Sequence, residues 1–182
     1  MKKLMLSAGL VVMAAPAMAH PGHEFGALAG ALHPLTGVDH LLAMLAVGLW
    51  SGFVMPNRVW AGAATFLAAM SAGAVLAWAG LVVGVEPMIL ASVTLFGLLV
   101  ALSRRGQSGA VTGASLAMIA VFAACHGYAH AAESVSAAPA YLAGFLGMTA
   151  ALHGFGILLA RRLPQGLTGA AIAAMGLMMM VA

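Results

Sequence analysis

Residues 33–50, HPLTGVDHLLAMLAVGLW, place two histidines and an aspartate directly before an apolar run that is typical of a membrane helix. An ionised carboxylate in hydrocarbon costs about 2.5–3.5 kcal/mol on insertion scales, so Asp39 must face the interior of a helix bundle and have a partner. Pro34 and Gly37 interrupt the helical pattern, because proline removes a backbone hydrogen bond and glycine loosens the segment. The stretch therefore predicts a helix, about residues 25–53, that unwinds locally and lets the carboxylate converge with both histidines.

The composition of the whole chain is that of an integral membrane protein. Of its 182 residues, 64% are hydrophobic and 6% are charged, and the mean hydropathy is +1.09. Soluble domains carry about a quarter charged residues, so this chain cannot cover a surface that faces water. Its seven Lys and Arg residues form no basic face, which argues against nucleic acid as a partner. The single cysteine excludes an intramolecular disulfide and a CxxC motif.

The N-terminus has the three parts of a secretory signal peptide. Two lysines precede the short apolar run LMLSAGLVVMAA, and Ala-Met-Ala at residues 17–19 is an A-x-A cleavage site. Cleavage there would start the mature chain at His20, on the outer side of a bacterial cytoplasmic membrane. The predicted organisation is a signal peptide, residues 1–19, followed by a single transmembrane domain, residues 20–182.

Proline, glycine and charged residues divide the mature chain into six apolar segments, and a spanning helix needs roughly 20 such residues. The predicted helices are 25–53, 59–83, 88–103, 109–131, 140–160 and 165–181. With the mature N-terminus outside, all five arginines fall on cytoplasmic turns, as the positive-inside rule requires. The predicted fold class is an all-α integral membrane protein with six transmembrane helices. Because three helices per half is an odd number, two related halves would have inverted topology.

The sequence CHGYAHAAE, residues 125–133, carries the clearest pattern of metal ligands. His126 and His130 are four residues apart and Glu133 follows three residues later, so the three side chains share one helical face. Two imidazoles and a carboxylate can hold one divalent transition metal, with donors suited to nickel, cobalt or zinc. The alternative is that each group hydrogen-bonds to a neighbouring helix.

The other histidines extend the predicted metal path. The first helix supplies ligands on both sides of its break, unless its Asp–His pair only links two helices. His153, toward the inner half of the fifth helix, is either a deeper ligand or a structural histidine. The mature N-terminus offers the free amine and imidazole of His20 with His23 nearby, or is only a polar start. The full set of candidate ligands is His20, His23, His33, Asp39, His40, His126, His130, Glu133 and His153.

With these motifs the chain resembles the HupE/UreJ family of small nickel permeases along essentially its whole length. The family's first-helix pattern is a histidine, five residues and then Asp-His, which His33, Asp39 and His40 match. Its fourth-helix pattern, Phe-His-Gly-x-Ala-His-Gly-x-Glu, is matched except at Cys125 and Ala131, where Phe and Gly are usual. The resemblance implies uptake of Ni²⁺ or Co²⁺ across the bacterial cytoplasmic membrane, which would supply hydrogenase or urease maturation.

The predicted function is a secondary transporter of a divalent transition metal, with no enzymatic activity and no prosthetic group. Its predicted partners are the metal ion and the lipid bilayer, and a homo-oligomer is left open. The short loops leave no room for a soluble domain, and no GxxxxGK[ST] phosphate loop is present for ATP-driven chemistry. Two alternatives stay open: a haem- or di-iron-binding membrane redox protein, and a metal sensor or chaperone partner that binds metal without transporting it.

Overall fold

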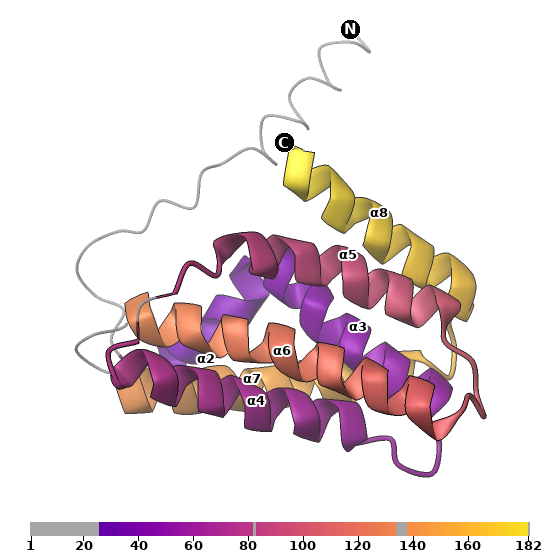
Figure 1. The fold of residues 1–182 in the computed structure, drawn as a ribbon, viewed down its shortest axis with the longest axis horizontal. Coiled ribbons are helices and arrows are strands. Elements are labelled where there is room, and N and C mark those ends of the chain that lie inside the picture. Colours follow the sequence, from indigo (N-terminus) through magenta and orange to yellow (C-terminus); the bar gives the residue numbers. More distant parts are fainter. Residues whose placement is uncertain (1–25, 82, 134–137, 182) are drawn as a thin grey trace, which may run out of the picture.

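The computed structural model describes residues 26–81, 83–133 and 138–181, and every regular element in these ranges is an α-helix. The helices are α2 (Ala27–Thr36), α3 (Val38–Val54), α4 (Ala61–Trp78), α5 (Glu86–Leu102), α6 (Gly109–Glu133), α7 (Ala138–Leu159) and α8 (Gln165–Val181). Figure 1 shows that they pack into one bundle, with α5 and α8 side by side along one edge. The predicted signal peptide and the predicted mature start, including His20 and His23, lie outside the described residues.

Each predicted apolar segment corresponds to helix, with one break and small shifts at the ends. The second helix ends at Trp78, because Gly80 adopts the left-handed conformation (φ 80°) that commonly terminates a helix. The third begins at Glu86, two residues earlier than predicted, because Pro87 fits the first helical turn, where its missing N–H is not needed. The sixth helix has the predicted bounds.

The first predicted helix is in fact two helices, α2 and α3, whose axes differ by 87°. Gly37 lies between them with an extended backbone (φ −91°, ψ 116°), and Pro34 lies inside α2. A Cβ at residue 37 would come within 2.9 Å of Asp39 Oδ1 and 3.0 Å of His40 Nδ1, so glycine leaves room for these polar groups. The predicted unwinding is present, and it is a sharp turn of the chain rather than a short interruption in a straight helix.

The helices pair in a pattern that repeats between the two halves of the chain. α4 packs most extensively on α6, α7 packs on both α2 and α3, and α5 packs on α8. At the α4–α6 and α3–α7 contacts, added Cβ atoms at Gly127 and Gly48 would collide with the backbone of the facing helix, so glycine permits the close approach. Exchanging the first predicted helix with the fourth, the second with the fifth and the third with the sixth maps these three pairings onto one another, whereas the contact of α3 with α5 has no comparable counterpart between α6 and α8 among the described residues.

The outside of the bundle is apolar, which identifies a membrane protein. Three described helices are long and apolar enough to span a bilayer, and the bent α2–α3 pair is a fourth if it forms one span. The apolar helices α5 and α8 have 17 residues each. Trp60 and Trp78 are about half exposed at the two ends of α4, about 27 Å apart at 1.5 Å per residue. Tryptophan at both ends of a helix is typical of the two membrane interfaces.

The positive charge of the described residues is concentrated at one end of the bundle. The five arginines lie on the connections α3–α4, α5–α6 and α7–α8, which Figure 1 shows at the same end. All five are exposed, and Arg58 and Arg105 line one shared pocket. Glu86 is exposed at the opposite end, where α5 begins. The charge asymmetry read from the sequence is therefore also present in the three-dimensional structure.

Candidate metal centre

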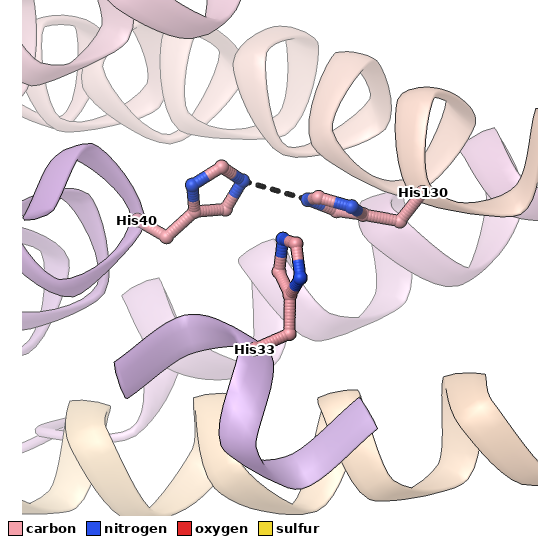
Figure 2. A group of neighbouring side chains, drawn as sticks. All are labelled: His33, His40 and His130. Atoms are coloured by element: carbon pink, nitrogen blue, oxygen red, sulfur yellow. Dashed lines mark hydrogen bonds between the residues drawn. The ribbon is translucent and has the colours of Figure 1, made fainter. Parts of the chain in front are cut away.

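Three histidines from three different helices meet at the end of the bundle opposite the arginines. His33 comes from α2, His40 from the start of α3 and His130 from the last turn of α6 (Figure 2). One nitrogen from each ring lies within 4.8 Å of the others, and His40 Nε2 is 2.7 Å from His130 Nε2. Nitrogens that bind one metal at about 2.0–2.1 Å lie about 3 Å apart, so small side-chain movements would let all three bind one ion. We call these three residues the histidine cluster.

One aromatic ring packs against all three imidazoles of the histidine cluster. Phe145, which is fully buried on α7, has its ring centroid 4.5 Å from that of His130, and it also contacts the other two imidazoles. His40 and His130 are buried, whereas His33 is partly exposed and gives the cluster an open side. The sequence alone did not distinguish Phe145, because a phenylalanine in an apolar helix has the pattern of a packing residue.

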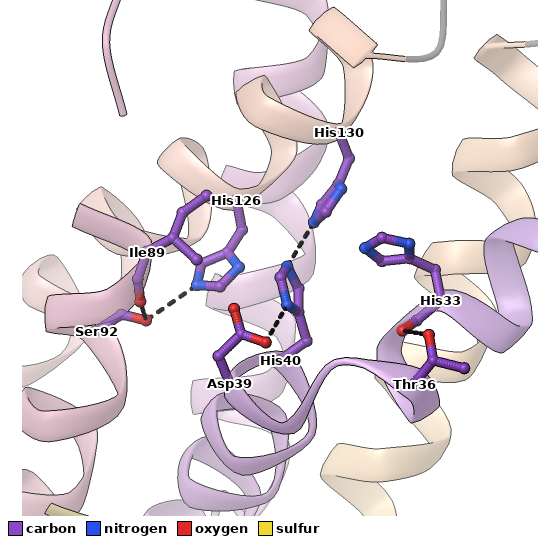
Figure 3. A network of polar contacts seen from close by, with 8 residues as sticks. All are labelled: His33, Thr36, Asp39, His40, Ile89, Ser92, His126 and His130. Carbon is purple, nitrogen blue, oxygen red and sulfur yellow. Dashed lines mark hydrogen bonds and ion pairs between the residues drawn. The ribbon is translucent and has the colours of Figure 1, made fainter. Parts of the chain in front are cut away.

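Asp39 lies behind His40 rather than in the cluster itself. Its Oδ1 is 2.9 Å from His40 Nδ1, in an electrostatic contact that is not a well-aligned hydrogen bond (Figure 3). A carboxylate at this position favours a proton on Nδ1, so that His40 Nε2 presents its lone pair on the side of His130. The sequence predicted Asp39 as a ligand that converges with both histidines. The structure instead gives it the place that carboxylates commonly take beside a metal-binding histidine.

His126 lies on the same face of α6 as His130, as predicted, but one turn deeper and completely buried. Ser92 Oγ donates a hydrogen bond to Ile89 O (2.6 Å), so it accepts one from His126 Nε2 (3.0 Å). His126 Nδ1 therefore carries a lone pair, and it has no hydrogen-bond partner among the described residues. The ring lies edge-on to His40 with centroids 5.1 Å apart, between His40 and Ser92 in Figure 3. His126 thus offers a further nitrogen next to the histidine cluster.

The other predicted ligands lie outside the histidine cluster or outside the described residues. His153 is fully buried on α7 and its Nδ1 donates to Met44 O (2.7 Å). Glu133 is the last residue of α6, but its side chain lies beyond what the structure describes. Cys125, which departs from the family pattern next to His126, is a partly buried free thiol.

The chemistry of the histidine cluster is that of a nitrogen-rich site for a first-row transition metal. Imidazole suits nickel, copper, iron and zinc, whereas magnesium and calcium prefer oxygen ligands. A haem with two histidine ligands holds their nitrogens about 4 Å apart, on opposite faces of the macrocycle. The 2.7 Å between His40 and His130 is too short for that arrangement, which counts against this pair as haem ligands.

Comparison with known proteins relates the whole chain to one family. A family model described as HupE / UreJ protein matches residues 8–182, which include every described helix. The chain is similar to Protein HupE of Rhizobium leguminosarum bv. viciae, with 37% identity over 166 residues, covering 88% of this chain and 85% of that protein. No solved structure gives a significant match.

Proposed function

This chain belongs to the HupE/UreJ family, and from that premise we propose that it is a secondary transporter for a divalent transition metal, Ni²⁺ or Co²⁺. The observation that carries the proposal is the histidine cluster, in which three imidazole nitrogens converge at one end of a membrane helix bundle. Buried histidines inside membrane helices are costly and mark ion paths. The cargo would be delivered for hydrogenase or urease maturation, and the protein itself would catalyse no reaction and hold no prosthetic group.

The proposed topology has six spans, with α2 and α3 together forming the first. The two 17-residue helices, α5 and α8, fall at the short end of the range that can cross a bilayer. The clustered arginines then face the cytoplasm, which orients the histidine cluster toward the outside of the bacterial cytoplasmic membrane. A signal peptide, residues 1–19, would be removed, leaving residues 20–182 as one transmembrane domain whose N-terminus is periplasmic.

Within this topology the ion would enter from the exposed side of His33. His33, His40 and His130 would replace part of its water shell, and His126 Nδ1 would be the next nitrogen inward. Asp39 would raise the basicity of His40 from behind the ring. His20, His23 and Glu133 are proposed to collect metal at the outer surface. A path of several weak ligands suits transport, because the ion must also leave.

Radioactive nickel uptake tests this function directly. In cells that lack their own nickel importers, the wild-type chain is expected to take up ⁶³Ni²⁺ above the vector level, and excess Co²⁺ should compete. His130→Ala should reduce uptake to near the vector level, because it removes one of three converging nitrogens. Ser115→Ala, on the same helix, is the matched control, because among the described residues that hydroxyl bonds only to the Val111 carbonyl in its own helix.

The comparison requires equal amounts of each variant in the membrane. Wild-type protein that is correctly inserted but gives no uptake above vector would contradict the transport proposal. In that case, metal binding by the purified protein would favour a sensor or chaperone role, and a haem absorbance band would favour the redox alternative.

Ser92→Ala is expected to weaken Ni²⁺ binding by about 10–100-fold, which is typical for loss of a group that orients a metal-binding histidine. The serine accepts a hydrogen bond from His126 Nε2 and thereby fixes the tautomer with a lone pair on Nδ1. Equilibrium dialysis of the purified full-length chain measures the change. Ser71→Ala on α4 is the control, because within the part of the chain that the structure describes the Ser71 hydroxyl bonds only to the Leu67 carbonyl. Equal affinities for Ser92→Ala and wild type would show that His126 takes no part in binding.

A further inference from the structure

His153 has the hydrogen bonding of a metal-binding histidine, although it lies outside the histidine cluster. Its Nδ1 donates to the backbone carbonyl of Met44 (2.7 Å), which can only accept, so Nε2 carries the lone pair. The residue is 0% exposed, and Nε2 has no hydrogen-bond partner among the described residues. Metal-binding histidines commonly hold their other ring nitrogen in this way, on a backbone carbonyl or a carboxylate. A buried nitrogen without a partner requires a reason.

A second buried polar atom lies one helical turn away on the same helix. Thr149 is 0% exposed, and its Oγ1 has no hydrogen-bond partner among the residues that the structure describes. Residues four apart share one face of a helix, so Thr149 and His153 lie on the same face of α7, one turn apart. His153 lies toward the arginine end of α7, six positions before the end of the helix at Leu159, and Thr149 lies near the middle of the helix. Two buried polar atoms without a described partner, an imidazole nitrogen and a hydroxyl oxygen, therefore lie one turn apart between the middle of α7 and its arginine end.

The ring of Phe66 contacts both His153 and His126, which lies next to the histidine cluster. We call the histidine cluster together with His126 the outer site. Phe66 of α4 is fully buried, and its ring centroid is 5.0 Å from that of His153 and 5.9 Å from that of His126. Both imidazoles have a ring nitrogen with no described partner. Phe66 is therefore the shared neighbour of two imidazoles that belong to different helices.

We propose that His153 Nε2 and Thr149 Oγ1 form a second, transient station for the transported metal ion, and that the Phe66 ring separates this inner station from the outer site at His126. The inference rests on the proposed transport function. The inner station has few ligands, so it would hold the ion weakly and release it toward the arginine end. Passage from the outer site requires the Phe66 ring to move aside.

Two substitutions of His153 distinguish a metal-binding role of this residue from a purely structural role. Asparagine places an N–H where Nδ1 was and keeps the bond to Met44, but it offers nothing at the position of Nε2. Glutamine offers an oxygen near the Nε2 position and loses the bond to Met44. In proteoliposomes of the full-length chain, His153→Asn is expected to reduce ⁶³Ni²⁺ uptake by about tenfold or more, and His153→Gln by clearly less. Equilibrium Ni²⁺ binding at the outer site should stay within about threefold of wild type for both variants.

The reverse order, in which asparagine preserves uptake better than glutamine, would overturn the inner station and leave His153 as a structural link between α7 and α3. His40→Ala, measured in the same assay, distinguishes a failure of the inner station from a failure of the transport function. If the wild type transports, His40→Ala does not, and His153→Asn matches the wild type, then only the inner station is wrong. If the wild type gives no uptake, then the transport function fails and this inference fails with it.

The role of Phe66 is tested with a smaller apolar side chain. Phe66→Leu is expected to raise the uptake rate by about threefold or more, because the barrier between the two sites becomes smaller, and to leave outer-site affinity unchanged. Phe96→Leu is the matched control: Phe96 is equally buried and contacts Phe66 and Phe122, and among the described residues it has no ring contact with a histidine. An uptake rate for Phe66→Leu at or below that of the control would overturn the separating role.

Discussion

His40→Ala is expected to weaken Ni²⁺ binding by more than about 100-fold and to abolish uptake, the largest functional loss of any single change in the histidine cluster. Its Nε2 lies 2.7 Å from His130 Nε2, and its ring contacts those of both His33 and His126. Removing it deletes one of the proposed ligand nitrogens and also leaves Asp39 without the imidazole that contacts its carboxylate. Loss of a group that only orients a ligand costs about 10–100-fold, so loss of this ligand should cost more.

Asp39→Asn provides the internal comparison for that prediction. The amide keeps the size of the side chain but removes the charge that favours a proton on His40 Nδ1, so affinity is expected to fall by about 10–100-fold. Equilibrium dialysis of the two purified variants shows which of them binds Ni²⁺ more weakly, and size-exclusion profiles check that both are folded. If Asp39→Asn is the more severe variant, then the carboxylate is a direct ligand, as the sequence first predicted. If His40→Ala binds like the wild type, the histidine cluster is not the metal site.

The sequence predicted the helices well because their limits depend on local chemistry. Apolar runs of sufficient length, glycine and proline positions, and short charged turns are all visible in one dimension, and they place each described helix within a few residues. The break near Pro34 and Gly37 was predicted for the same reason. Its 87° angle was not, because the angle depends on how α2 and α3 each pack against α7.

The candidate site was predicted only where its residues share a helix. The four-residue spacing placed His126 and His130 on one face of α6, and the structure agrees. The spacing could not show that His33 and His40, from opposite sides of a sharp turn, would meet His130 while His126 pairs with Ser92. Such contacts arise from packing between helices that are distant in the sequence.

Residues that shape the site without carrying charge were missed for a related reason. Phe66 and Phe145 lie in apolar helices, where a phenylalanine is the expected packing residue, and only their ring contacts with histidines distinguish them. The sequence could have identified Ser92 as a site residue, because its hydroxyl group lies within the apolar run ILASVTLF. Polar residues inside membrane helices are uncommon, and each one requires a partner.

Gly127→Ala is expected to destabilise the protein strongly, whereas Gly113→Ala on the same helix should be neutral or stabilising. A Cβ at residue 127 would collide with the carbonyl oxygen of Met70 on α4, and a backbone atom cannot turn away as a flexible side chain can. Overpacking costs about 1–3 kcal/mol and occasionally more. A Cβ at residue 113 would meet nothing within 4 Å. There the usual gain of about 1 kcal/mol for alanine over glycine in a helix should remain.

Thermal unfolding of the two purified variants in one detergent measures this difference, and the Tm of Gly127→Ala is expected to fall by several degrees while that of Gly113→Ala does not fall.

The prediction also concerns the metal site, because Gly127 follows His126 directly. If the added methyl group pushes α6 away from α4, it moves His126 relative to Ser92, whose hydroxyl accepts the hydrogen bond that orients the ring. Gly127→Ala protein that remains folded should therefore bind Ni²⁺ more weakly than Gly113→Ala. Equal Tm values for the two variants would show that α4 and α6 do not approach as closely as the structure has them, and the position assigned to His126 would then be wrong as well.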